Sequence, residues 1–592
     1  MKPLYDRINS KGASVYFIVI LFISLSVYFS VSNNEFLINW DDGSQVVNNP
    51  DINNISFTEI KKIFSSYYVG MYQPLTTISY AIDYALFGLS AEAFHLSQLL
   101  YHFFVIILVY TLLIRTTKNY FLSFILSLIF AVHPLNVESV AWISARSNIL
   151  YTIFYILAIL SYLKYLKQEK KVRYYMLTII FFVLSCLSKS AAITLPVLLI
   201  VIDYFYSKIN WKNLINKLPF FLISVVFGLI TIDARTKASH IVDLNEHYTH
   251  IQLILITVFS VFRYVQLFVF HTNYSAFYTY PEKINDLLPA EFYYVPIIFI
   301  LIVIILSWIL FKKNKPVLFG LLFFLVSLSV MLKIVPAGMQ YMADRYMYLP
   351  MIGLFICLGQ IKSEYFRKHL IILIGSFFIY ILFLSYKTLL YNEYWKNESQ
   401  LYEQTLKTQP NAVPVKNFLG IIHKKNGNTK EALFYFDDII NKYPAYGSVY
   451  NNRGNLYKDL GNFDMAMQDY NMAILYEGEQ PEIFTNIGIL YAMSEDNEMA
   501  ISYFTKAIKM DSEFYLAFFN RGKMFAMNGY FDKALNDLNK AILINPEFSM
   551  AYYTRGMVFY SLGNSEDACK DLKMAEKLGN KQAKAQIIGI CN

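Results

Sequence analysis

Two adjacent carboxylates, Asp41 and Asp42, follow the first long apolar run of the chain, within the segment Asn-Trp-Asp-Asp-Gly at 39–43. Charges this close to a membrane segment are costly and usually serve a function. A carboxylate can act as a general base that takes the proton of an attacking hydroxyl group. Adjacent residues in an extended loop point apart, so the two groups need not share one site. We assign Asp41 as the base and Asp42 as a group that orients the acceptor or a loop helix, although the sequence leaves the choice open.

Three cations beside apolar runs could complete such a site: Arg146, Lys189 and Arg345. An Arg can hold phosphate oxygens through two parallel hydrogen bonds, whereas Lys acts as a point charge. Fixed cations stabilise the negative charge that builds up on a leaving phosphate. We therefore interpret these three residues as ligands of a donor phosphate. The alternatives are that they extend to lipid head groups or pair with Glu138 and Asp344.

Four more side chains are candidates for positioning the donor or the acceptor: His133, Glu138, Tyr72 and Asp344. Tyr72 lies in a long aromatic-rich loop and could stack on a sugar ring. A lone His before Pro is more often a capping or packing residue, and that alternative stays open for His133. We expect no metal, because fixed cations can neutralise a phosphate, although paired carboxylates could recruit a divalent ion.

The composition shows what must hold these residues. The 592 residues are 56% hydrophobic, 17% aromatic and only 16% charged, which excludes an ordinary soluble protein and indicates a polytopic membrane protein. The net charge of +8 arises from short basic clusters between apolar runs, so it indicates membrane orientation rather than nucleic-acid binding. The four cysteines have no metal-type spacing, and we expect neither a zinc site nor a disulfide scaffold.

The apolar runs predict a helical membrane domain over residues 1–390. They lie at about 14–32, 97–114, 119–132, 148–163, 174–188, 191–206, 216–232, 251–270, 293–311, 316–335, 347–360 and 369–388. Strict alternation through every run would place the basic cluster near 312–315 on the wrong side, so we interpret 251–270, which Arg263 interrupts, as re-entrant or as two half-spans. About eleven spans remain. The N-terminus is then cytoplasmic, and the first outer loop, about 33–96, lies on the non-cytoplasmic face.

The C-terminal part contains an internal repeat of 34 residues. Three ladders share this period: Gly420, Gly454, Gly488, Gly522 and Gly556; Ala432, Ala466, Ala500, Ala534 and Ala568; and Phe436, Tyr470, Phe504, Leu538 and Leu572. This is the period of the tetratricopeptide repeat, in which small residues let the two helices of a repeat pack closely. We predict a linker at 391–412, five repeats over 413–582 that stack into an α-solenoid, and a tail at 583–592.

Asn452, Asn486 and Asn520 repeat two residues before the glycines, on the first helix of successive repeats. An amide both donates and accepts hydrogen bonds, so such a ladder could grip an acceptor polypeptide by its backbone. The arrangement resembles the asparagine ladder in the repeat domain of the nucleocytoplasmic O-linked N-acetylglucosamine transferase. The alternative is that these residues are merely solvated.

The order of motifs along the whole chain resembles one family, the transmembrane and tetratricopeptide-repeat-containing proteins and their bacterial relatives. The motifs are Trp40-Asp41-Asp42, Asn48-Asn49-Pro50, Tyr72-Gln73-Pro74-Leu75, His133-Pro134 with Glu138 and Arg146, Leu187-Ser188-Lys189, Ala343-Asp344-Arg345-Tyr346, Tyr348-Leu349-Pro350, and Tyr394-Trp395-Lys396 before the repeats. The chain departs from the family pattern at Gln73, Asn148 and Ser190. The resemblance implies a C-type glycosyltransferase fold, a polyprenyl- or dolichyl-phosphate-linked sugar as donor substrate and, as in the animal members, O-mannosylation of protein hydroxyls.

Together these features predict an all-α protein, a polytopic bundle followed by a repeat solenoid. We expect a glycosyltransferase of inverting type that moves mannose or a similar hexose from a polyprenyl phosphate to Ser or Thr of exported proteins, without a cofactor. The repeats would bind the acceptor on the periplasmic or extracytoplasmic side of the inner membrane. The rival interpretation is a non-enzymatic membrane scaffold for envelope assembly. A transporter would need neither the acidic loop nor the solenoid.

Overall fold

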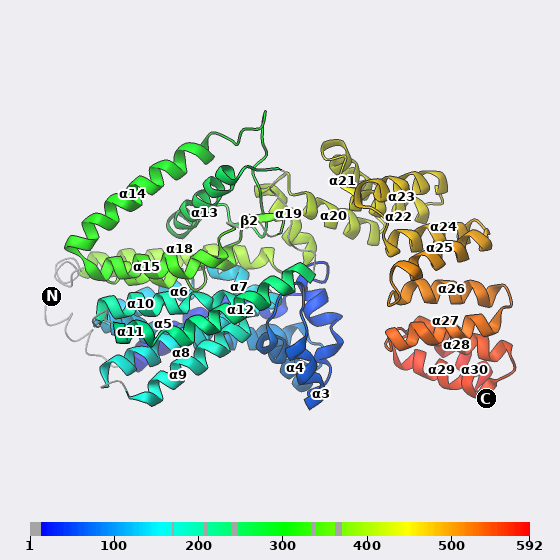
Figure 1. Cartoon of the computed structure of the whole chain (residues 1–592), viewed down its shortest axis with the longest axis horizontal. Coiled ribbons are helices and arrows are strands. Elements are labelled where there is room, and N and C mark those ends of the chain that lie inside the picture. The colour runs from blue at the N-terminus through cyan, green and yellow to red at the C-terminus, as the bar shows by residue number, and fades with distance from the viewer. Residues whose placement is uncertain are drawn as a thin grey trace. The chain divides into compact units, whose positions relative to one another are not determined.

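The computed structural model describes residues 13–168, 171–206, 211–237, 247–333, 338–360 and 370–591. The chain forms two compact units, Met1–Ala412 and Val413–Asn592 (Figure 1). Both are helical. In the described part of the chain the extended elements are two short antiparallel strands, β1 (Tyr278–Thr279) and β2 (Gln340–Met342), which belong to the first unit. The all-α fold class predicted from the sequence is therefore confirmed.

The helices of the first unit vary widely in length. The α-helices are α2 (Ala13–Tyr28), α3 (Phe57–Ser65), α4 (Pro74–Phe87), α5 (Ala91–Thr117), α6 (Tyr120–Ala131), α7 (Val137–Ala141), α8 (Arg146–Lys167), α9 (Val172–Ser188), α10 (Leu195–Tyr206), α11 (Trp211–Ile215), α12 (Leu218–Lys237), α13 (His250–Phe270), α14 (Glu291–Lys313), α15 (Lys315–Leu328), α16 (Met351–Leu358), α18 (Leu370–Tyr394) and α19 (Glu398–Thr408). Short 3-10 or π turns connect them: η1 (Phe29–Asn33), η2 (Gly43–Val47), η3 (Pro50–Ile52), η4 (Pro134–Asn136), η5 (Ile143–Ala145), η6 (Ser190–Thr194), η8 (Ser329–Met331) and η9 (Asp344–Met347).

Seven helical segments of the described chain are long and apolar enough to cross a membrane. They are Val15–Asn33, Ala91–Thr117, Ile143–Lys167, Asn213–Lys237, His250–Phe270, Glu291–Leu310 and Ile374–Tyr394. A pair bent by 54°, Tyr120–Ala131 with Pro134–Ala141, would make an eighth span, and three further apolar helices are shorter. The predicted multi-pass bundle is thus present, while the number of about eleven spans stays a prediction.

The run at 251–270 differs from our expectation of a re-entrant segment or two half-spans. It forms α13, one helix of 21 residues that meets the length and hydropathy of a full span. Arg263 does not break it, because its guanidinium donates to Gln266 Oε1 one turn further on, at 2.6 Å. The bend lies instead between α6 and α7, where Pro134 follows His133.

The first outer loop is folded into helices rather than extended. Ser56 caps α3, its hydroxyl accepting from the backbone N–H of Glu59 at 3.2 Å, and Pro74 occupies the first turn of α4. A small apolar core joins this loop to α5 and η5. It consists of Val46, Ile52, Tyr80, Ala81, Phe94 and Ile143. The acidic segment at 41–42 is therefore held by a folded layer.

The segment 391–412, which we expected to be a linker, belongs to the first unit. It contains the end of α18 and the whole of α19. Trp395, between these two helices, is fully buried and stacks on Trp142 with ring centroids 6.1 Å apart. The connection is thus part of the folded unit that carries the acidic loop.

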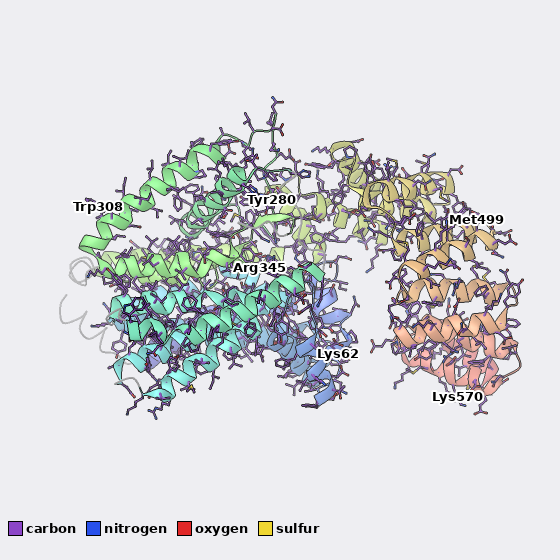
Figure 2. The ribbon with its side chains drawn as sticks, viewed as in Figure 1. Lys62, Tyr280, Trp308, Arg345, Met499 and Lys570 are labelled. Carbon is purple, nitrogen blue, oxygen red and sulfur yellow. A yellow bond between two sulfur atoms is a disulfide. The ribbon has the colours of Figure 1, made fainter. Side chains whose placement is uncertain are left out.

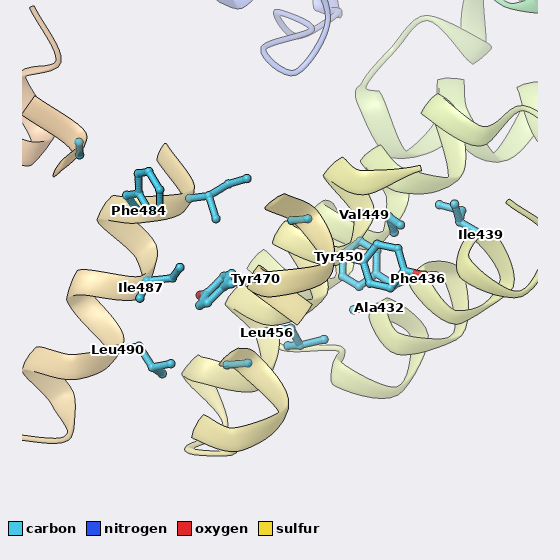
Figure 3. Close-up of a cluster of buried hydrophobic side chains, with 14 of the residues drawn as sticks. Ala432, Phe436, Ile439, Val449, Tyr450, Leu456, Tyr470, Phe484, Ile487 and Leu490 are labelled. Atoms are coloured by element: carbon cyan, nitrogen blue, oxygen red, sulfur yellow. The ribbon is translucent and has the colours of Figure 1, made fainter. Parts of the chain in front are cut away.

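The second unit contains the predicted helical repeats. Its helices are α20 (Val413–Lys425), α21 (Thr429–Lys442), α22 (Gly447–Asp459), α23 (Phe463–Glu477), α24 (Pro481–Met493), α25 (Asn497–Met510), α26 (Tyr515–Met527), α27 (Phe531–Ile544), α28 (Ser549–Ser561), α29 (Ser565–Lys577) and α30 (Lys581–Ile590). Ten of them, α20 to α29, pair in sequence as five two-helix repeats. Phe436 and Tyr470 of the third ladder lie in one buried core (Figure 3), and Phe504, Leu538 and Leu572 are buried as well.

The glycine ladder is explained by close helix packing within each repeat. A Cβ atom added to Gly488 would lie 2.6 Å from Cε1 of Phe504, and one added to Gly454 would lie 2.9 Å from Cε1 of Tyr470. The alanine ladder is fully buried throughout. The glycine ladder therefore packs against the ladder of large residues, Phe436 to Leu572, across the two helices of each repeat.

Charged residues also connect the repeats, a feature that we did not read from the sequence. In α22 the guanidinium of Arg453 binds Asp469 of its own repeat through two hydrogen bonds of 2.9 and 2.7 Å, and Asp437 of the preceding repeat at 2.6 Å. Arg521 and Arg555 recur in register and make the same kind of double bond to an Asp sixteen residues ahead. Each Arg thus ties three helices together.

A disulfide joins Cys569 of α29 to Cys591, just after α30. We expected no disulfide scaffold from the sequence, and this single cross-link is confined to the last helices of the array. It fixes α30 against the final repeat, where Ala583 of α30 is buried with Leu572 and Ala575.

Candidate functional site

Asp42 anchors the acidic loop. Its Oδ2 accepts from the backbone N–H of Leu37 at 3.0 Å, and its Oδ1 accepts from the backbone N–H of Ser144 at 2.9 Å and from the Ser144 hydroxyl. The side chain is completely buried, and this burial raises the pKa of Asp42 to about 6. A buried carboxylate that accepts three hydrogen bonds from the protein holds a loop in place.

Asp41 has a different environment, because its side chain is half-buried rather than enclosed. Its carboxylate lies near enough to the Arg345 guanidinium for the two charges to interact. The preceding residue, Trp40, stacks on Tyr402 with ring centroids 5.5 Å apart and meets Trp142 edge-on at 6.2 Å. Of the two carboxylates, Asp41 is the one with access to a substrate.

Arg345 and Glu138, two predicted site residues, form an ion pair. The Arg345 guanidinium donates to Glu138 Oε1, and its backbone N–H donates to Glu138 Oε2 at 2.7 Å. Figure 2 labels Arg345 in the first unit. Its side chain remains 14% exposed, and its guanidinium carbon lies 5.1 Å from the Trp142 ring. Glu138 therefore orients Arg345 and leaves part of the guanidinium accessible.

Lys189 lies beside Arg345 at the end of α9. Its Nζ donates to Asn148 Oδ1 at 2.6 Å and lies 5.7 Å from the Tyr346 ring, whose other neighbour is the Arg345 guanidinium carbon at 5.0 Å. Burial, and to a smaller extent the positive charge of Arg345, lower the pKa of Lys189 to about 7. An anion bound here would restore the charged form of the lysine.

Two cations that we did not select from the sequence belong to the same cluster. The charges of Arg235, at the end of α12, and Lys333, after η8, both lower the pKa of Lys189. Burial lowers the pKa of Lys333 itself. Their signal in the sequence was a charge within or at the end of an apolar run, which marks a functional position in a membrane protein. Four cations thus gather around two carboxylates, Glu138 and Asp41.

Arg146 does not join this cluster, although we interpreted it from the sequence as a ligand of the donor phosphate. It is 0% exposed and forms an ion pair with Asp83 of α4 at 2.6 Å. The remaining N–H groups donate to the carbonyl of Phe94 at 2.9 Å, the Ser97 hydroxyl at 2.9 Å, and more weakly to Gln98 and Ser79. Since an Arg has five donors, the protein itself occupies them. Arg146 holds the first loop against α5.

Two of the positioning candidates, His133 and Asp344, have partners within the protein. His133 is fully buried, caps η4 by accepting from the Leu135 N–H at 3.2 Å and stacks on Phe268, which matches the packing alternative rather than a contact with substrate. The carboxylate of Asp344 accepts from the hydroxyls of Tyr278 and Tyr391 at 2.7 and 3.0 Å.

Tyr72 is half-buried and lies against α12. Its hydroxyl donates to the carbonyl of Phe64 at 3.1 Å, and its ring meets Tyr67 edge-on. Tyr67 in turn donates to Asp233 of α12 at 2.7 Å. Tyr72 therefore lies on the part of the first loop that contacts the helix carrying Arg235, and its stacking role stays a prediction.

The asparagine ladder is partly used within the repeats. Asn452 Nδ2 donates to Asn417 Oδ1 and Asn486 Nδ2 donates to Asn451 Oδ1, each at 3.0 Å, whereas Asn520 Nδ2 donates to the carbonyl of Leu516. All three side chains are half-buried. These bonds account for amide donors, and the binding of an acceptor by this ladder stays a prediction.

Among the described residues, no three His, Cys, Asp or Glu side chains are arranged to hold a metal ion. Metal independence remains an expectation that activity measurements must test.

Comparison with known proteins supports the resemblance seen in the motifs. Tetratricopeptide-repeat family models match residues 419–446, 448–477 and 485–549. A protein O-mannosyl-transferase of Caenorhabditis elegans is 26% identical over 461 residues, which cover 72% of this chain and 63% of the relative. Protein O-mannosyl-transferase TMTC1 of Homo sapiens is 24% identical over 450 residues, which cover 65% of this chain and 49% of that protein. The chain thus spans about half to two thirds of the length of these relatives.

Two solved structures are similar to less than a third of the chain. The crystal structure of MamA is 23% identical, covers 28% of this chain and 97% of its own, and has a TM-score of 0.24. The crystal structure of YrrB, described as a tetratricopeptide-repeat protein with an unusual peptide-binding site, is 18% identical, covers 30% of this chain and 93% of its own, and has a TM-score of 0.24.

Proposed function

We propose that this protein is a membrane glycosyltransferase that moves mannose, or a similar hexose, from a polyprenyl-phosphate donor to Ser or Thr hydroxyls of exported proteins. One observation carries the proposal: the accessible carboxylate, Asp41, lies beside Arg345 in a cluster where four cations face two carboxylates. Such a surplus of positive charge suits a phosphate, and a base beside it suits transfer to a hydroxyl.

In the proposed reaction, the Asp41 carboxylate takes the proton of the acceptor hydroxyl as its oxygen attacks the anomeric carbon. The new carbon–oxygen bond forms while the bond from that carbon to the phosphate oxygen breaks, and the lipid phosphate leaves with the bonding electrons. Arg345 and Lys189 neutralise the charge on this phosphate. A single displacement of this kind inverts the anomeric carbon.

The sugar and the acceptor are inferred from the relatives and the repeats. The curated relatives carry the name protein O-mannosyl-transferase, which supports mannose as the sugar and a protein as the acceptor. Tetratricopeptide repeats form surfaces that bind extended polypeptides. The second unit would accordingly select the acceptor, with Asn452, Asn486 and Asn520 offering their amide oxygens to its backbone.

We further propose that the site and the repeats lie on the extracytoplasmic side of the inner membrane. The disulfide between Cys569 and Cys591 supports this side, because disulfides persist in oxidising compartments and are rare in the cytosol. The basic clusters of the short loops support a cytoplasmic position for the N-terminus.

The alternative function is a membrane-anchored scaffold in which the repeats recruit partners. A scaffold would need no carboxylate and cation cluster at the ends of its helices. Buried or half-buried charges are expensive in a membrane protein, so their convergence around Arg345 favours the enzyme.

The test uses the full-length protein in liposomes with a polyprenyl-phosphate mannose donor and Ser- and Thr-containing peptides, and mass spectrometry detects added hexose. Replacing a general base lowers the rate by about 10²- to 10⁴-fold, and we expect this loss for Asp41→Asn. The matched control is Glu403→Gln on the surface of α19, where Glu403 accepts from the Ser399 hydroxyl. If Asp41→Asn transfers hexose as fast as the unchanged protein, Asp41 is not the base. If the unchanged protein transfers none, the scaffold is favoured.

A further inference from the structure

Helix α19 grips the two residues that precede Asp41. Glu398, in its first turn, accepts from both nitrogens of Asn39: the backbone N–H donates to Oε1, and the side-chain Nδ2 donates to Oε2 at 2.6 Å. One turn later, Tyr402 stacks on Trp40 with an interplanar angle of 29° and is itself fully buried. A backbone bond from the Glu35 N–H to the Lys396 carbonyl, 2.9 Å, closes the same contact.

Asp41 therefore lies between two fixed points. On its N-terminal side Asn39 and Trp40 are held by α19, and on its C-terminal side Asp42 is held by Leu37 and Ser144. The Asp41 carboxylate, between these two points, interacts with the charge of Arg345. A carboxylate that acts as a base must be held close to its productive position, because a misplacement of about 1 Å can cost 100-fold in rate.

We propose that Glu398 is a positioning residue for Asp41, and that α19 is the element that sets the catalytic loop. This inference rests on the proposed function, since it assigns Glu398 a role in the same site. Glu398 acts through Asn39 and does not contact the substrate. The segment that we had expected to be a linker thereby becomes part of the catalytic apparatus.

The donor and acceptor roles of Asn39 and Glu398 can be exchanged by substitution. Glu398 supplies two acceptors and Asn39 supplies two donors. In Glu398→Gln, one acceptor becomes an NH₂ group, which can bond Asn39 only if the Asn39 side-chain amide rotates to present its oxygen. In Asn39→Asp, two carboxylates oppose each other. The double variant Asn39→Asp with Glu398→Gln restores both bonds, since the Gln NH₂ donates to the new Asp and the Gln oxygen accepts from the backbone N–H.

The experiment measures hexose transfer by the full-length protein and its three variants in liposomes, at varied donor concentration. We expect Asn39→Asp to lower kcat by about ten- to 100-fold and Glu398→Gln to lower it less, with KM for the polyprenyl-phosphate donor within about twofold because the cation cluster is untouched. The double variant should recover most of kcat. Glu403→Gln, on the exposed face of the same helix, should retain the parental kcat.

The outcomes separate this inference from the proposed function. Parental kcat in both single variants, or a double variant no better than the worse single, would overturn the positioning role even if Asp41→Asn is inactive. A rise of KM with unchanged kcat would also overturn it, because Glu398 would then act on donor binding. Absence of transfer by the unchanged protein would instead refute the proposed function, and with it the premise of this inference.

Discussion

Replacing Arg146 should damage folding and spare donor binding. The structure gives this guanidinium an ion pair with Asp83 at 2.6 Å and two strong bonds, both 2.9 Å, to Phe94 and Ser97. In Arg146→Leu, Asp83 would remain buried with only the Ser97 hydroxyl as a close partner, at 2.5 Å. Removing one member of a buried ion pair costs about 3–5 kcal/mol, whereas replacing both by apolar groups is often nearly neutral. We therefore expect a large loss of stability that Asp83→Leu partly restores.

The assay is thermal unfolding of the purified full-length protein in detergent, together with binding of a polyprenyl-phosphate mannose donor to the fraction that remains folded. Lys189→Gln is the matched control, because Lys189 is a cation at a helix end whose Nζ donates to a neutral group, the Asn148 side-chain oxygen. It should unfold near the parental temperature and bind donor more weakly. The reasoning is refuted if Arg146→Leu keeps the parental unfolding temperature and loses donor affinity, since that is the behaviour of a phosphate ligand.

Two further predictions concern the second unit. Gly488→Ala should lower the free energy of unfolding of the fragment 413–592, measured in urea, by about 1–2 kcal/mol, because overpacking against Phe504 outweighs the gain in helix propensity. The control is Gly522→Ala, whose Cβ would first meet Leu538 at 3.1 Å and which should be neutral or stabilising. Equal effects of the two substitutions would contradict the packing argument. Alkylation of cells before lysis should leave Cys569 and Cys591 unmodified and joined in one peptide pair by mass spectrometry; alkylation of both in intact protein would oppose the proposed extracytoplasmic side.

The repeat unit was the most predictable part of the molecule. A 34-residue period constrains every repeat at once, and each glycine and its aromatic partner occupy equivalent places in the two-helix hairpin. The packing of Gly454 on Tyr470 follows directly from that period. The Arg453 and Asp469 pair was equally periodic in three repeats but was missed, because charged residues on a repeat surface are usually assumed to be solvated.

The sequence predicts that the first unit is a multi-pass helical bundle, but it does not predict which partners its buried charged residues have. Arg146 and Lys189 look alike in the sequence, since each stands beside an apolar run. Their roles differ because α4, a helix of the first loop, brings Asp83 to Arg146, whereas Lys189 meets the neutral Asn148. Which acid approaches which cation depends on contacts between segments distant in the sequence, and hydropathy contains no information on those contacts.

Asp41 and Asp42 also differ in their surroundings, and this difference separates their roles. Adjacent residues have nearly the same sequence context, so only the surroundings can separate them. The surroundings of Asp42 are three donors from Leu37 and Ser144, which use its oxygens, whereas Asp41 stays half-buried near Arg345. A general base must be accessible so that it can exchange a proton with the substrate, whereas a carboxylate that holds the loop in place must be shielded from the substrate. Asp42 thus holds the loop in place and Asp41 is left to react with the substrate. Helix α19 fixes the other end of the segment through Glu398 and Asn39.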